Sequence, residues 1–226
     1  MGIDLVQMGS AVLVLLLSLS LHESAHAWTA DRLGDATARD LGRVSMNPWV
    51  HADLFGTIIF PLLSLSLSLG LIFGWAKPVP VNIARLKNPR KDYMLVAAAG
   101  PAANLLLALG FLLTLLILKL WSPLTQDLVR SVVRGAPAGE SIFVIFVSMA
   151  YFGVMINTIL LLFNMIPIAP LDGAAVLSGF LPESLVLPYQ KVQKFGVVIL
   201  IGIVVLGVPW YFFRPIMGAV RLILIQ

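Results

Sequence analysis

The chain has 226 residues, of which 59% are hydrophobic and 12% are charged, and its mean hydropathy is +0.98. A soluble protein of this size carries about a quarter of its residues as charges, so the composition excludes a soluble fold and indicates a protein embedded in a lipid bilayer. Cysteine is absent, which excludes disulfides and thiolate metal sites, and the net charge of +4 comes from basic loops that indicate topology rather than nucleic-acid binding.

About six apolar segments are predicted to be membrane-embedded helices. They are residues 5–29, 54–74, 92–119, 142–168, 171–180 continuing towards 190, and 195–224. The longer segments can cross a hydrocarbon layer of about 30 Å at ~1.5 Å per helical residue. The polar stretches between them are loop-sized, so residues 1–226 are predicted to form one all-α polytopic membrane domain.

The first segment ends in two histidines and a glutamate within the sequence HESAH, residues 22–26. On a helix, His22 and His26 share one face and can bind one metal ion, whereas Glu23 is rotated by about 100° and is better placed to act on water. Imidazole and carboxylate ligands with an open fourth position favour one Zn²⁺ ion. The alternative is a polar helix end facing water, but an acid at mid-bilayer costs ~2.5 kcal/mol or more and is usually functional.

The loop after the second segment reads GWAKPVPVNIARLKNPRKDY. Its Val79–Pro80–Val81 alternation suits an extended edge segment, because proline has no N–H for a central strand. We therefore predict a short extended element near 77–83. The loop is also rich in basic residues, which predicts that it faces the cytoplasm.

The fourth segment runs into the sequence NMIPIAPLDG, in which Pro167 and Pro170 are expected to end the helix immediately before Asp172. Irregular backbone at membrane depth is tolerated only where it is buried in protein or lines a water-filled cavity. Asp172 is therefore the best candidate for a third metal ligand.

The pairing of HESAHAW with NMIPIAPLDG resembles the site-2 protease family, the intramembrane zinc metalloproteases, and GWAKPVPVN and AAAGPAAN are also similar. The resemblance covers a core of about 20–180, followed by a C-terminal membrane segment of about 195–224. It implies hydrolysis of a peptide bond within or near a transmembrane segment of a substrate protein. It makes His22, His26 and Asp172 the zinc ligands and Glu23 the catalytic glutamate. The chain has no room for a PDZ-like or nucleotide-binding domain, so the resemblance is to a minimal form.

The resemblance also suggests that Asn104 and Asn164 lie near the site and bind substrate backbone or an oxyanion; the alternative for each is an interhelical hydrogen bond. Residues Val79, Pro80 and Val81 are expected to pair with an unwound substrate by strand addition. His51 matches no motif and is expected to be a loop or interface residue.

Two other functions stay open at this point. A metal-transporting membrane protein could use the same ionisable residues, but it would need more polar positions along its pathway. An inert relative could bind transmembrane helices, but it would have no use for Glu23. The expected location is the plasma membrane of a prokaryote, with the active site nearer the cytoplasmic face and the oligomeric state unspecified.

The order of the motifs poses a topological problem. HESAH and Asp172 each follow an apolar segment, and three further segments separate them, so three full crossings would put them on opposite faces of the membrane. Either the site lies near mid-membrane, or segment 54–74, interrupted by Pro61, enters the membrane and returns. The basic residues in both flanking loops favour the second alternative.

Overall fold

The computed structural model describes residues 5–60, 63, 74–137, 139 and 141–226. Among these residues, four helices are long and apolar enough to cross a membrane: α1 (Leu5–Arg32), α5 (Pro89–Trp121), α7 (Ile142–Asn164) and α11 (Val208–Ile225). The protein is therefore an all-helical integral membrane protein, as its composition predicts.

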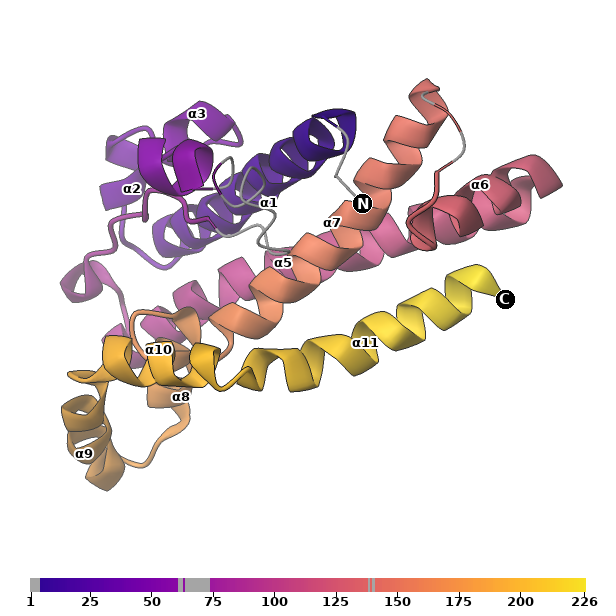
Figure 1. Ribbon diagram of the computed structural model, residues 1–226. Coiled ribbons are helices and arrows are strands. Elements are labelled where there is room, and N and C mark those ends of the chain that lie inside the picture. Colours follow the sequence, from indigo (N-terminus) through magenta and orange to yellow (C-terminus); the bar gives the residue numbers. More distant parts are fainter. Residues whose placement is uncertain (1–4, 61–62, 64–73, 138, 140) are drawn as a thin grey trace.

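Helix α5 lies at the centre of the bundle and contacts α1, α7 and α8 (Asp172–Phe180) (Figure 1). The largest apolar core lies where α5, α7, α11 and the short helix α6 (Pro123–Val133) meet, and it buries Leu115, Val133, Val147, Val154 and Leu224. A smaller cluster joins α1 to α7. Large apolar side chains on the outer faces of the long helices stay exposed, as expected of surfaces in contact with lipid.

The ends of the helices follow from local sequence. Ser122 caps α6 by accepting a hydrogen bond from the N–H of Thr125. Helix α7 ends at Asn164, before the first of the two prolines expected to break it. Gly207 separates α10 (Gly196–Val205) from α11 and has φ of +71°, a left-handed conformation that glycine adopts without steric cost.

Two of the expected membrane segments are each divided into two helices. Segment 171–190 forms two short helices, α8 and α9 (Glu183–Gln193), and segment 195–224 is split into α10 and α11. Helices α9 and α10 form a pair bent by 72°, which would be a fifth span if it counted as one. Most of segment 54–74 lies outside the described residues. The expected number of about six is therefore not confirmed.

The extended element expected near 77–83 forms no strand in the described part of the chain. Residues 74–82 have irregular backbone, and Ile83–Arg85 form one 3₁₀ turn. The physical reason is that the two prolines have no N–H, while the N–H groups of Lys77, Val79 and Asn82 donate to acceptors outside any strand.

The described residues between α1 and this segment include two short helices. They are α2 (Thr37–Asp40) and α3 (Pro48–His51), and they are followed by a π-helical turn over Leu54–Ile59. Asp35 anchors this region to the segment 74–82, because its carboxylate accepts hydrogen bonds from the N–H of Thr37 and, at 2.6 Å, from that of Asn82. The loops on either side of residues 54–74 therefore pack against each other.

Candidate metal centre

Helix α1 presents both histidines of the HESAH sequence to the interior of the bundle. His22 and His26 are buried, and their Nε2 atoms lie 3.0 Å apart. The uninterrupted helix explains this arrangement, since residues four apart share one face. The imidazoles therefore converge as the spacing predicts.

Asp172, the first residue of α8, completes a group of three possible ligands. Its Oδ2 atom lies 3.2 Å from Nε2 of His22 and 3.4 Å from Nε2 of His26. This oxygen is buried and has no hydrogen-bond partner. A buried carboxylate oxygen without a partner is costly, so its position between two imidazole nitrogens indicates a cation site.

The spacing of the three donor atoms fits zinc. A tetrahedral zinc ion with bonds of about 2.0–2.1 Å keeps its ligands about 3.3–3.4 Å apart. The three observed separations lie between 3.0 and 3.4 Å. Two imidazoles and one carboxylate also leave the fourth position open, which is the arrangement of a catalytic site.

Helix α5 orients both imidazole rings. The Nδ1–H of His22 donates to Oδ1 of Asn104 at 2.6 Å, and the Nδ1–H of His26 donates to the carbonyl of Val96 at 2.7 Å. Because both acceptors are carbonyl oxygens, each Nδ1 carries a hydrogen, and in a neutral ring this leaves Nε2 free to act as a metal ligand.

Glu23 lies beside this ligand group, on the adjacent face of α1. Its Oε2 atom accepts a hydrogen bond of 2.9 Å from the N–H of Val79. The segment 74–82 therefore contacts the glutamate directly. Val79 was expected to serve a substrate strand, whereas its N–H here donates to the carboxylate of Glu23.

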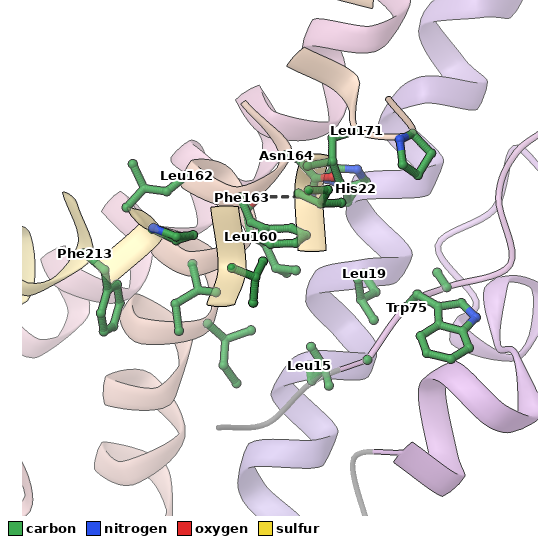
Figure 2. Close-up of a pocket in the computed structure, with 18 of the residues that line it drawn as sticks. Leu15, Leu19, His22, Trp75, Leu160, Leu162, Phe163, Asn164, Leu171 and Phe213 are labelled. Carbon is green, nitrogen blue, oxygen red and sulfur yellow. Dashed lines mark hydrogen bonds between the residues drawn. The ribbon is translucent and has the colours of Figure 1, made fainter. Parts of the chain in front are cut away.

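A cavity of about 390 Å³ opens next to His22 and Glu23. Its walls are mainly apolar. They come from helices α1, α7, α10 and α11 and from residues 74–76, the start of segment 74–82. Figure 2 shows His22, Asn164 and Leu171 together at one end of the cavity, with Trp75 and Phe213 on opposite sides. The site therefore joins a polar group of ligands to an apolar compartment.

The two asparagines expected near the site occupy different positions. Asn164 lines the cavity, and its amide donates to the carbonyl of Leu160 in its own helix. Asn104 is fully buried behind His22 and also donates to Asn157, so it makes the interhelical hydrogen bond named as its alternative.

Sequence reasoning missed Asn157 and gave His51 too little weight. Asn157 is a polar residue in the middle of an apolar helix, and this placement in the sequence could have marked it as a candidate for a buried polar contact. His51 is buried, and its Nε2 atom lies 2.8 Å from the carbonyl oxygen of Ser45 and 3.3 Å from Oγ of Ser24, inside the HESAH sequence. It is an interface residue, as expected, but the interface includes α1, the helix that carries HESAH.

Comparisons with known proteins agree with this geometry. Residues 10–207 match the sequence model of peptidase family M50. The chain is 32% identical over 211 residues to "Putative zinc metalloprotease YwhC" of Bacillus subtilis, covering 93% of this chain and 86% of that protein. It is 30% identical over 204 residues to "Putative zinc metalloprotease Rip2" of Mycolicibacterium smegmatis, covering 87% of this chain and 68% of that protein. No solved structure gives a significant match.

The fold and the site define an integral membrane metalloprotease. The chain belongs to peptidase family M50, and the resemblance to the site-2 proteases is confirmed. It is an intramembrane zinc metalloprotease with Zn²⁺ as its cofactor. The transporter and the inert relative are not favoured by these findings.

Proposed function

We propose that this protease hydrolyses a peptide bond within or near a transmembrane segment of a substrate protein, with His22, His26 and Asp172 holding the zinc ion and Glu23 acting as general base and acid. The observation that carries the assignment is the convergence of three ligand atoms to within 3.4 Å of one another beside Glu23. The catalytic unit is proposed to be the single domain 1–226, with its core at about 20–180.

The zinc ion, when bound, supplies Lewis-acid chemistry that polarises the scissile carbonyl and makes water acidic near pH 7. Glu23 takes the proton from the attacking water and passes it to the leaving amine. The N–H of Val79 holds Oε2 of Glu23, and we assign the other carboxylate oxygen, Oε1, to the proton transfer. This hydrogen bond therefore orients the base.

The apolar cavity is the proposed place for substrate residues next to the scissile bond. Its apolar lining matches the side chains of a transmembrane segment. We assign contact with the substrate backbone to Asn164, because it lines the same cavity as His22 (Figure 2). Asn104 is fully buried and accepts a hydrogen bond from His22, so we assign it the role of orienting the His22 ring instead.

The residues Val79, Pro80 and Val81 are proposed to lie alongside the unwound substrate. Pro80 has no N–H, and that of Val79 donates to Glu23. Pairing is therefore assigned to the N–H of Val81 and to the carbonyl groups of this segment.

The site is proposed to open toward the cytoplasmic face of the plasma membrane. The segment that contacts Glu23 belongs to the most basic loop of the chain, and basic loops stay in the cytoplasm. The described ends of segment 54–74 also meet, because the carbonyl of Gly56 accepts a hydrogen bond of 3.0 Å from the N–H of Trp75. This contact supports the alternative in which the segment enters the membrane and returns.

The replacement Glu23→Gln tests the assignment. It keeps the size of the side chain and removes the base, so zinc content is expected to equal that of the wild type. Cleavage of a model transmembrane peptide is expected to fall by about 10²- to 10⁴-fold. Unchanged cleavage would remove Glu23 from its role, and a purified wild-type protein that never binds zinc would reject the proposed ligand group.

A further inference from the structure

A chain of buried hydrogen bonds runs behind His22 and connects three helices. The amide of Asn104 on α5 donates to Oδ1 of Asn157 on α7 at 2.8 Å. The amide of Asn157 in turn donates to Oγ of Ser18 on α1 and to the carbonyl of Gly153, each at 2.9 Å. Both asparagine side chains are fully buried, so no water competes for these bonds.

The order of donors and acceptors along these hydrogen bonds is fixed by the carbonyl of Gly153. A main-chain carbonyl can only accept, so Asn157 must turn its NH₂ group toward Gly153. Its Oδ1 then faces Asn104, which must use its own NH₂ group as the donor. The oxygen of Asn104 is left facing Nδ1 of His22. His22 can satisfy that contact only by carrying its hydrogen on Nδ1.

The two histidines differ in whether their acceptor needs other hydrogen bonds to keep it in place. His26 donates to the main-chain carbonyl of Val96, which cannot reverse its polarity. His22 donates to a side-chain amide, which can rotate by half a turn and present NH₂ instead of oxygen. A reversed Asn104 would favour a hydrogen on Nε2 of His22, the atom that faces Asp172.

We propose that Asn157 is a positioning residue of the metal centre. It transmits the polarity of the Gly153 carbonyl through Asn104 and holds His22 in the tautomer whose Nε2 is free to bind zinc. The inference rests on the proposed role of His22 as a ligand. It assigns a function in zinc binding to a residue that is neither one of the proposed ligands nor one of the residues that line the cavity.

The replacement Asn157→Leu removes the directing amide and keeps the branched shape and the number of heavy atoms of the side chain. Zinc affinity, measured by competition with a chelator in detergent, is expected to fall by about 10- to 100-fold, as is typical when the support of a metal-binding histidine is removed. Ser18→Ala is the matched control: it also deletes a bond of Asn157 but leaves the carbonyl of Gly153 in place, so it is expected to lower zinc affinity much less. Equal affinity for Asn157→Leu and the wild type would overturn the proposal.

A second variant distinguishes the effect of Asn157 on the orientation of the Asn104 amide from its effect on packing. In Asn104→Asp, both oxygens of residue 104 are acceptors, so no amide orientation needs to be held. Adding Asn157→Leu to this background is expected to cost little zinc affinity, whereas the same change in the wild type costs the full amount. An equal loss in both backgrounds would show that Asn157 only packs, and would overturn the proposal.

A spectroscopic measurement on the unmutated protein covers the case in which Asn157→Leu does not fold. The chain has three histidines, so ¹⁵N-labelled imidazoles give a simple NMR spectrum. Metal-free wild type is expected to show His22 with its hydrogen on Nδ1, and a predominant Nε2–H form would overturn the inference. His22→Ala provides the remaining distinction: if it retains zinc, the proposed ligand group fails, whereas if it loses zinc while Asn157→Leu does not, only this inference fails.

Discussion

At the scale of single residues, Gly100 shows how closely α5 approaches His22 and His26, the proposed metal ligands. A Cβ atom at this position would lie 2.4 Å from Nε2 of His26 and 2.6 Å from Nε2 of His22. Such distances are shorter than any normal non-bonded contact, so the absence of a side chain is a condition for the site. Gly100 belongs to the sequence AAAGPAAN, and the close contact that it permits is with the two histidines.

The replacement Gly100→Ala is therefore expected to displace the imidazoles and weaken zinc binding, and with it peptide cleavage. A shift of about 1 Å in a reacting group can cost about 10²-fold in rate. Gly110→Ala on the same helix is the control, because a Cβ atom there meets nothing within 4 Å. Zinc content and turnover of both purified variants test the point, and a fully active Gly100→Ala variant would contradict the geometry.

At the scale of secondary-structure elements, segment 74–82 is held in place by contacts along its length. Arg43 donates to the carbonyls of Lys77 and Pro78, and the N–H of Lys77 donates to the carbonyl of His51. The N–H of Val79 donates to Glu23, and that of Asn82 donates to Asp35. Segment 74–82 has irregular backbone, but these anchors fix it against Glu23.

The replacement Val79→Pro removes the N–H that holds Glu23. A hydrogen bond to a charged group contributes about 1.5–3 kcal/mol, so kcat is expected to fall by about tenfold or more while zinc content and KM change little. Val79→Ala keeps the N–H and is expected to retain more of kcat. If KM rises and kcat stays constant in Val79→Pro, this amide serves substrate binding instead of orienting the base.

At the scale of the whole molecule, the site forms where three helix ends meet. The C-terminal part of α1 carries His22 and His26, the N-terminal half of α5 carries their acceptors, and α8 follows the end of α7 (Figure 1). Two crossings, α5 and α7, separate HESAH from Asp172 when segment 54–74 returns to its starting face. An even number of crossings brings both motifs to one side of the membrane.

Cysteine labelling tests this topology cleanly, because the chain has no cysteine of its own. Met46→Cys and Lys87→Cys lie in the two loops that flank segment 54–74, and both are expected to react with a membrane-impermeant thiol reagent from the cytoplasmic side. Leu124→Cys, at the start of α6, is expected to react from the opposite side. Labelling of positions 46 and 87 from different sides would reject the returning segment.

The sequence by itself determined the membrane environment, the long helices and the main metal-binding candidates. These features are local: apolar length defines a span, spacing by four defines a shared helix face, and paired prolines end a helix before Asp172. The match to family M50 agrees with these inferences. The strand expected near 77–83 was not found because the tertiary partners of its N–H groups, such as Glu23 and Asp35, are remote in the chain.

Only the tertiary structure decided which groups support the ligands. The sequence left two roles open for Asn104, and only the folded chain shows that its side chain is hydrogen-bonded to both His22 and Asn157. Val96 and Gly153 contribute main-chain carbonyls, which no residue type reveals. The physical reason is that hydrogen bonds between helices depend on rotation and depth, and these are set by packing over the whole bundle.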